Sequence, residues 1–203
     1  MYLDRTAHWE NVYETKAPNK VSWSQEYPKI SFEIVQSFEL PKTAKIIDVG
    51  GGDSKLVDCL LDNGYEDITV LDISEKALIR AQNRLQDKAS KVNWIVSDIT
   101  KFKPDTSFDI WHDRAAFHFL TEADEISQYV ALASSCVKGY LSVGTFSKQG
   151  PVKCSGLNIL QYSKEELMSA FSSGFNYLDS KFEDHTTPFD TIQNFLFCSF
   201  KKK

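Results

Sequence analysis

The chain has 203 residues, of which 42% are hydrophobic and 25% charged, and its formal net charge at pH 7 is −5. This length and composition are typical of a single globular domain and exclude a disordered or fibrous chain. The acidic balance leaves no broad basic face for nucleic-acid phosphates, and no apolar run reaches the length of a membrane span.

Strands and helices alternate along the sequence from Lys45 onward. We expect strands at 45–49, 68–71, 92–96, 108–112 and 140–146, helices at 55–63, 75–85, about 124–136 and from about 164, and two further β-rich runs at 175–182 and 194–200. This alternation predicts a doubly wound α/β fold, with a mostly parallel seven-stranded sheet and helices on both faces. No helical pattern separates the last two runs, which predicts a C-terminal antiparallel hairpin.

Polar side chains mark three of the expected helix starts. Ser74 is a candidate N-cap for the helix at 75–85. Capping-box spacing joins Thr121 with Asp124, and Ser163 with Glu166. These signals predict where the helices begin.

A glycine-rich segment, Asp48-Val49-Gly50-Gly51-Gly52-Asp53-Ser54, follows the first strand and precedes the first helix. Glycines there let the backbone turn tightly and approach a ligand closely. A nicotinamide-binding loop needs a third glycine three residues after the second, where this chain has Lys55, and it binds a pyrophosphate that Asp53 disfavours. The segment therefore favours a ligand that has a cationic centre and no phosphate.

Two more carboxylates follow the next two strands. Asp72 ends the second strand, where a carboxylate can accept hydrogen bonds from both hydroxyls of a ribose. Asp98 ends the third strand, where it can accept one from an exocyclic adenine amine. The alternative is that Asp48, Asp72 and Asp98 are only turn and cap residues, since Asp is common after strands. Three acids at successive strand ends favour a nucleoside site.

With these motifs the sequence resembles the class I S-adenosylmethionine-dependent methyltransferases, a family with a Rossmann-like fold, from about Ala44 to the C-terminus. The matching segments are 46–52, Leu71-Asp72-Ile73, Ser97-Asp98-Ile99, 108–113 and 137–146. The resemblance implies S-adenosyl-L-methionine as the cofactor. It also implies that the methionine part is held by Asp48, Gly50, Gly51 and Gly52, the ribose by Asp72 and Ile73, and the adenine by Asp98 and Ile99.

The same resemblance places methyl transfer at the end of the fourth strand, in Trp111-His112-Asp113-Arg114. Transfer requires that the acceptor is positioned and, if it is an amine or weak acid, deprotonated. We expect Asp113 to contact the acceptor as a base or orienting carboxylate, with His112 as the second catalytic candidate. The alternative is that Asp113 and Arg114 form a plain surface ion pair. His118, flanked by two phenylalanines, is expected to be a packed or capping histidine rather than a base.

Residues 1–43 form a leader ahead of the domain, which we place at 44–203. The leader contains Trp9-Glu10-Asn11-Val12-Tyr13. This Trp-acidic-x-x-Tyr element is similar to that of a methyltransferase subgroup that includes protein-lysine methyltransferases, where it helps to cover the active site. The other interpretation is an aromatic staple that packs the leader onto the core. Both interpretations are compatible.

Three residues outside the strand ends are candidates for acceptor binding. Trp23 lies in the leader, Cys154 in the Gly/Pro-punctuated loop 150–157, and His185 between the last two strands. Loops at the ligand-bearing end of such a sheet usually shape the acceptor pocket.

The other cysteines, Cys59, Cys136 and Cys198, lie in apolar patterns and are expected in the core. No Cys-x-x-Cys pair occurs, so neither a zinc site nor a disulfide framework is indicated, and no His/Asp/Glu cluster suggests a metal. We expect a cytoplasmic enzyme that methylates a small molecule and has no nucleic-acid or membrane partner. The alternatives are methylation of a protein lysine, suggested by the leader, and a cofactor-binding module without catalysis.

Overall fold

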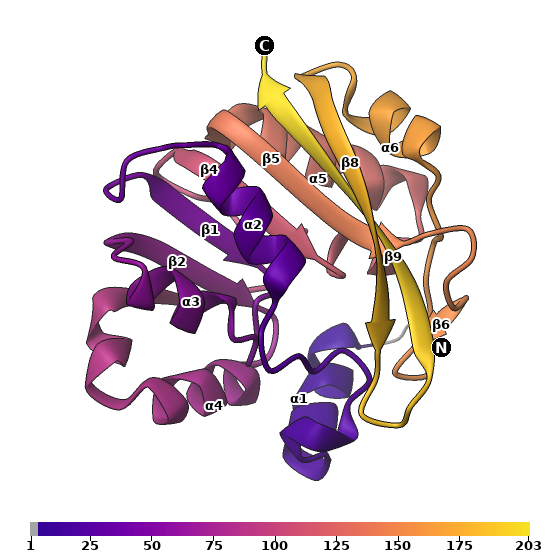
Figure 1. Cartoon of the computed structure of the whole chain (residues 1–203). Helices are drawn as coiled ribbons and strands as arrows, with labels where there is room; N and C mark the ends of the chain where they lie inside the picture. Colours follow the sequence, from indigo (N-terminus) through magenta and orange to yellow (C-terminus); the bar gives the residue numbers. More distant parts are fainter. Residues whose placement is uncertain (1–3) are drawn as a thin grey trace.

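The computed structural model describes residues 4–203. Its main sheet has seven strands in the order β3-β2-β1-β4-β5-β9-β8 (Figure 1). These strands are β1 Lys45–Val49, β2 Asp67–Asp72, β3 Val92–Val96, β4 Phe108–Arg114, β5 Val137–Phe146, β8 Phe175–Thr186 and β9 Ile192–Lys202. A separate antiparallel pair, β6 Lys153–Cys154 and β7 Leu157–Asn158, lies in the loop after β5.

The strand directions confirm the predicted doubly wound fold. β1 pairs in parallel with β2 and β4, β2 with β3, and β4 with β5, so the carboxyl ends of five strands meet at one edge. β9 runs antiparallel to both β5 and β8, which confirms the C-terminal hairpin. The hairpin is longer than predicted, because its main-chain pairing continues past the apolar runs to Thr186 and Ile192.

Helices cover both faces of the sheet, as predicted. They are α1 Arg5–Thr15, α2 Lys29–Ser37, α3 Leu56–Asp62, α4 Glu75–Leu85, α5 Ala123–Cys136 and α6 Lys164–Phe171, with short 3-10 turns at Pro18–Lys20, Gln86–Lys91 and Phe117–Phe119. In Figure 1, α2 and α3 lie in front of the sheet and α5 and α6 behind it, while α1 lies beyond the strand ends beside α4. None of the helices within residues 4–203 is long and apolar enough to cross a membrane.

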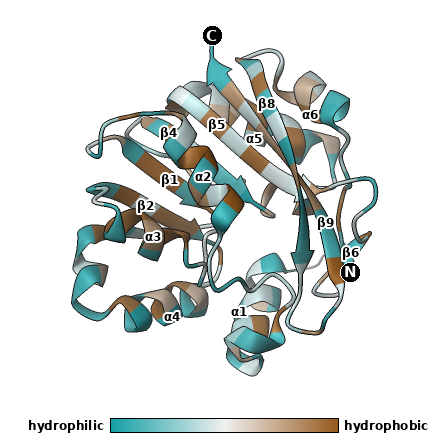
Figure 2. Ribbon diagram, viewed as in Figure 1, coloured by the Kyte–Doolittle hydropathy of each residue, from teal (hydrophilic) through white to brown (hydrophobic). Residues whose placement is uncertain are grey.

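Each face of the sheet has its own hydrophobic core. Hydrophobic residues follow the central strands in Figure 2. Under α5 and α6 the largest fully buried side chains are Trp111, Phe117, Tyr129, Phe171 and Phe200. Under α2 and α3 they are Phe146, Phe195, Phe197, Ile46, Leu56 and Leu60. Burial of each such side chain contributes about 1.5–3 kcal/mol, so the two cores fix the strand ends that carry the polar residues.

Two of the three predicted helix starts are confirmed. The Ser74 side chain accepts a hydrogen bond from the Ala77 amide, and Ser163 forms the full capping box with Glu166. The start predicted at Thr121 is wrong. The N-cap residue of α5 is Glu122, which makes no side-chain capping bond, so Thr121 lies one residue outside the cap.

The helices of the leader, α1 and α2, have no counterpart among the predicted elements. In α1 only Val12 and Tyr13 are buried, so the helix has no apolar stripe that sequence periodicity could detect. Its start is nevertheless capped, because the Asp4 carboxylate accepts a hydrogen bond from the Ala7 amide at 3.0 Å.

Candidate active site

A cavity of about 440 Å³ lies at the carboxyl ends of the parallel strands, beside the junction of β1 and β4 where strand order reverses. Ligands of doubly wound sheets bind at this point, and the volume is that of a small-molecule site. Most of the predicted site residues line this cavity: Asp48, Gly50, Gly51, Asp72, Ile73, Asp98, Ile99, His112, Trp23 and Cys154. The cavity lining does not include Gly52, Asp113 or His185.

The glycine turn presents bare backbone beside the cavity. Gly50 and Gly52 have φ values of +66° and +46°, a region that favours glycine. A Cβ on Gly50 would lie 2.6 Å from the Ala116 Cβ, and one on Gly52 would lie 2.8 Å from the Tyr13 hydroxyl. Glycine is therefore required at this turn by its backbone angles and by the close approach of Ala116 and Tyr13, while Gly50 and Gly51 line the cavity without a side chain.

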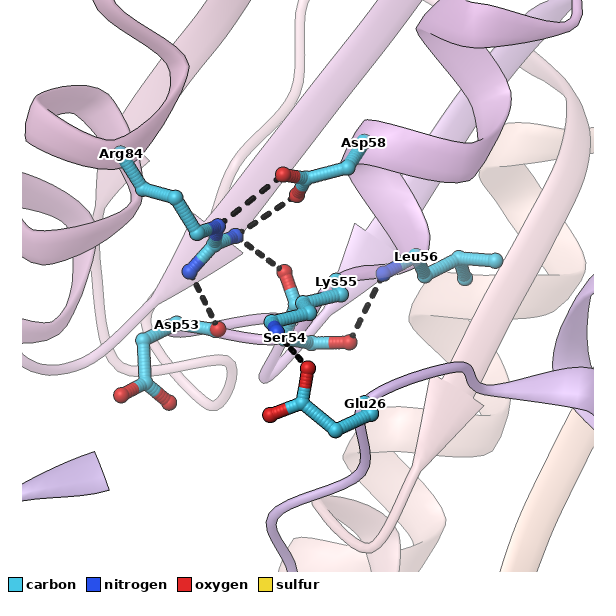
Figure 3. Close-up of polar contacts among 7 residues, drawn as sticks. All are labelled: Glu26, Asp53, Ser54, Lys55, Leu56, Asp58 and Arg84. Carbon is cyan, nitrogen blue, oxygen red and sulfur yellow. Dashed lines mark hydrogen bonds and ion pairs between the residues drawn. The ribbon is translucent and has the colours of Figure 1, made fainter. Parts of the chain in front are cut away.

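Arg84 of α4 holds the segment that follows this turn (Figure 3). Its guanidinium donates to the carbonyl oxygens of Asp53 and Ser54, both at 2.8 Å. It also makes two hydrogen bonds to the Asp58 carboxylate, at 3.0 and 2.7 Å. An ion pair between Lys55 and Glu26 ties the same segment to the leader (Figure 3). No local sequence pattern identifies Arg84, because its partners lie more than two dozen residues away.

Asp72 is the most buried acid of the nucleoside side. Its Oδ1 accepts a hydrogen bond from the Ser74 amide at 2.8 Å. Burial raises the pKa of this carboxyl to about 7, helped by the nearby charges of Asp53 and Asp48. Asp98 is partly exposed, and its Oδ1 accepts from both the amide and the hydroxyl of Thr100. Each acid thus caps a turn and also lines the cavity, so the turn interpretation and the ligand interpretation hold together.

His112 reaches the cavity from β4. Its Nδ1 lies 2.7 Å from the Asp48 Oδ1, and both side chains are almost completely buried. A carboxylate only accepts, so Nδ1 carries the proton, and in the neutral imidazole Nε2 has a free lone pair. Nε2 is buried and has no hydrogen-bond partner among the described residues. This geometry is that of a base held in one tautomer by an acid.

Asp113 faces the opposite side of the sheet, because successive residues of a strand alternate. Its carboxylate accepts hydrogen bonds from the amides of Ala116 and Phe117 and from the Tyr129 hydroxyl, the last at 2.6 Å. Burial raises its pKa to about 6. The structure thus separates Asp113 from His112, and places it where it fixes the chain after β4. It is fully buried, so the alternative of a surface ion pair with Arg114 is wrong.

Arg114 lies on the same face of β4 as His112 and lines the cavity. Its Nη1 donates to the Trp23 carbonyl at 3.2 Å, and its guanidinium lies 4.6 Å from the centre of the Phe195 ring. The sequence places Arg114 in the expected transfer segment but predicts no role for its side chain beyond a surface ion pair with Asp113. Its partners are remote in sequence, so no local signal identifies it.

The remaining predicted acceptor contacts lie around the same end of the cavity. Cys154 is buried, and burial raises the pKa of its thiol to about 11, so it stays protonated at neutral pH. His185 donates from Nε2 to the Ser22 carbonyl at 2.7 Å, and burial lowers its pKa. His118 is fully buried, and its Nδ1 accepts from the Phe146 amide, which confirms that it is a packed histidine.

Aromatic residues of the leader line the cavity on the solvent side. The Trp9 ring packs edge-on against Trp23 and Phe119, with centroids 5.6 and 5.1 Å apart. Tyr13 lies 6.2 Å from Trp23, and its hydroxyl approaches the glycine turn. Arg80 of α4 holds α1 in place by donating to main-chain carbonyls at its C-terminal end. The aromatic residues of the leader therefore pack against one another and contribute to the lining of the cavity.

The site residues fit a nucleoside ligand better than a metal ion. Within the described part of the chain, no group of three or more His, Cys, Asp or Glu side chains is arranged to hold a metal. By contrast, the bare turn, the Asp72 carboxylate and the apolar side chains of Ile73 and Ile99 offer the surfaces that a ribose and a base require.

Comparisons with known proteins agree with this geometry. The sequence matches the methyltransferase domain family over residues 46–139. Mouse eEF1A lysine and N-terminal methyltransferase is 26% identical over 122 residues, which cover 59% of this chain and only 17% of that protein. Mouse EEF1A lysine methyltransferase 2 is 24% identical over 205 residues, covering 92% of this chain and 76% of that protein.

Among solved structures, Burkholderia thailandensis 1,6-didemethyltoxoflavin-N1-methyltransferase aligns with a TM-score of 0.74 at 16% identity. The alignment covers 98% of this chain and 87% of that chain, whose structure contains 1,6-didemethyltoxoflavin and S-adenosylhomocysteine. At this identity the likeness concerns the fold.

Proposed function

We propose that this chain, a class I S-adenosylmethionine-dependent methyltransferase, transfers a methyl group to a small-molecule acceptor that binds beside His112. The observation that carries the proposal is the buried, unpartnered Nε2 of His112 in a cavity covered by Trp9, Trp23 and Phe119. The cofactor would share this cavity of about 440 Å³, so the space left beside His112 suits a small acceptor better than an extended macromolecular surface.

The two halves of the cavity have different roles, since one would bind the cofactor and the other the acceptor. When bound, S-adenosylmethionine supplies a methyl group on a sulfonium, which is a strong electrophile. The backbone at Gly50–Gly52 and the carboxylate of Asp48 would hold its methionine part, Asp72 its ribose hydroxyls, and Asp98 with Ile99 its adenine. The opposite half, at His112 and Arg114, is left for the acceptor.

The chemical role of the protein is to position and deprotonate the acceptor. His112 takes a proton on Nε2 from the acceptor atom, and the Asp48 carboxylate stabilises the resulting imidazolium through the Nδ1 hydrogen bond. The aromatic side chains of Trp9, Trp23 and Phe119 that line the cavity would help to orient the acceptor. Asp113 acts indirectly, because its carboxylate fixes the backbone at Ala116 and Phe117, next to the glycine turn.

Methyl transfer from labelled S-adenosylmethionine tests the proposal. The purified protein is incubated with a small-molecule extract below about 1 kDa, and the label is traced by chromatography and mass spectrometry. We expect a labelled small molecule, and at least about a 100-fold lower yield with His112→Gln. Tight binding of S-adenosylhomocysteine together with no labelled small molecule would count against a small acceptor.

Methylation of a protein lysine is the second candidate. It is favoured by the similarity to mouse EEF1A lysine methyltransferase 2 over 92% of the chain, and by the aromatic leader. A lysine side chain would have to enter the cavity that Trp9 and Trp23 help to line. Incubation of a protein lysate with the labelled cofactor distinguishes the two candidates, because a labelled protein band with unlabelled metabolites supports the lysine.

A further inference from the structure

The acceptor half of the cavity contains a guanidinium whose free edge has no partner. The Nε and Nη2 atoms of Arg114 are buried, and neither has a hydrogen-bond partner among the described residues. Within residues 4–203, Nη1 is the one guanidinium nitrogen that donates a hydrogen bond, to the Trp23 carbonyl. Nε and Nη2 point in parallel from one edge of the guanidinium, and this edge matches the two oxygens of a carboxylate or phosphate.

Arg114 also lacks a direct counter-ion, since no carboxylate within residues 4–203 forms an ion pair with it. The acids whose charges act on it are Glu183 and Asp48. Glu183 accepts from the Gln25 side chain at 2.8 Å and keeps its Oε2 unpartnered, whereas Asp48 is bound to His112. A guanidinium keeps its charge when it is buried, and an unpaired buried charge is costly. A ligand whose anionic group pairs with Arg114 would remove this free-energy cost of the unpaired charge.

Two neighbours hold the guanidinium of Arg114 in place. The guanidinium packs on the Phe195 ring of β9, and the Trp23 carbonyl of the leader holds Nη1. These contacts place Arg114 on the side of β4 away from β1 and β2, which carry the glycine turn and Asp72. Two residues earlier on the same face of β4, His112 presents its own unpartnered Nε2.

From this juxtaposition we infer that the methyl acceptor is a small anion, whose carboxylate or other oxyanion pairs with Nε and Nη2 of Arg114 while its nucleophilic atom lies at Nε2 of His112. The inference rests on the proposed function, because it names the acceptor class of the same site. Arg114 is then a specificity-determining residue. A cationic acceptor such as a lysine side chain would leave Arg114 unpaired and bring like charges together.

The experiment separates the extract before the methyl-transfer assay. A strong anion exchanger at pH 7 divides the small molecules into a retained anionic fraction and a flow-through of neutral and cationic compounds, and each is assayed with labelled S-adenosylmethionine. We expect the label in the anionic fraction. Arg114→Gln should lower that labelling at least about 30-fold and Arg114→Lys less, because the lysine keeps the charge but not the paired donors.

Affinity for S-adenosylhomocysteine, measured by calorimetry on the same variants, completes the test. It should stay within about threefold of the wild-type value, which also shows that the variants are folded. A large loss of this affinity in Arg114→Gln would overturn the inference by assigning Arg114 to the carboxylate of the cofactor. Labelling mainly in the flow-through, or unchanged labelling in Arg114→Gln, would overturn it by showing that Glu183 suffices as a counter-ion. No labelling in any fraction would instead contradict the proposed function.

Discussion

Nδ1 of His112 lies 2.7 Å from Oδ1 of Asp48, across the pairing of β4 with β1, where the two residues are direct neighbours in the register. Parallel pairing brings an acid of the glycine segment beside a base of the fourth strand, although 64 residues separate them. Because the acid fixes the tautomer, only Nε2 can accept a proton from a ligand in the cavity. The pair acts as a unit.

This arrangement makes a prediction for substitutions of the pair. His112→Gln should lower the turnover number at least about 100-fold, because the base is lost, and change the affinity for S-adenosylhomocysteine by less than about threefold. Asp48→Asn should lower turnover less. With S-adenosylmethionine saturating, because Asp48 would also hold the cofactor, the double variant should be no slower than His112→Gln alone, since members of one unit are not additive. Losses that multiply in the double variant would show that the two residues act independently.

The cofactor half of the site could be predicted from sequence because its residues follow directly from the fold. The first strand ends in glycines, and each of the next two strands ends in an acidic residue. Once these strands are parallel, their carboxyl ends must meet at one edge of the sheet. In the structure Asp48, Asp72 and Asp98 all line one cavity. Local pattern and topology suffice for such residues.

The acceptor half depends on contacts that sequence does not display. His112 and Asp113 are adjacent and both can titrate, and alternation shows only that they face opposite sides of the sheet. Which of these two sides is open to a ligand depends on Tyr129 of α5, whose hydroxyl donates a hydrogen bond to the Asp113 carboxylate. Arg114 depends on Trp23 and Phe195, from the leader and the last strand. No local spacing encodes these partners.

Asp113 should prove to be a positioning residue. In Asp113→Asn the amide oxygen can still accept from the amides of Ala116 and Phe117, whereas the bond from Tyr129 weakens. We expect the free energy of unfolding in urea to fall by about 1–2 kcal/mol, and turnover below the melting temperature to stay within about fivefold of wild type. Tyr129→Phe is the matched variant and should show the same pattern. If Asp113→Asn is folded and inactive while Tyr129→Phe is active, Asp113 takes part in the chemistry.

Arg84 should stabilise both the fold and the cofactor site. Arg84→Gln removes hydrogen bonds to Asp58 and to two carbonyls of the glycine segment (Figure 3). We expect a loss of about 2 kcal/mol in the free energy of unfolding and at least about fivefold weaker binding of S-adenosylhomocysteine, because the segment is no longer preorganised. The control is Lys88→Gln, which breaks the exposed ion pair with Asp62 and should leave the free energy of unfolding nearly unchanged, because solvent screens such a pair. Equal losses in both variants would contradict the role of Arg84.

The raised pKa of Asp72 makes the stability of the ligand-free protein depend on pH. Burial raises the pKa of this carboxyl from 3.8 to about 7, so between about pH 4 and 7 the folded protein binds more protons than the unfolded chain. The free energy of unfolding therefore falls as pH rises through this window, and the full cost is present above pH 7. Asp72→Asn removes this cost. It should raise the melting temperature of the ligand-free protein at pH 8 by on the order of 5 °C, and by much less at pH 4.5.

The effect on ligand binding should have the opposite sign. Ribose hydroxyls donate to an ionised carboxylate, so binding of S-adenosylhomocysteine favours the charged form of Asp72 and releases a proton below pH 7. Affinity measured by calorimetry should fall by up to about tenfold per pH unit below pH 7 and level off above it. Asp72→Asn should bind at least about tenfold more weakly at pH 8 and lose this pH dependence. A variant that is more stable without ligand yet binds as tightly as wild type would show that Asp72 does not hold the ribose.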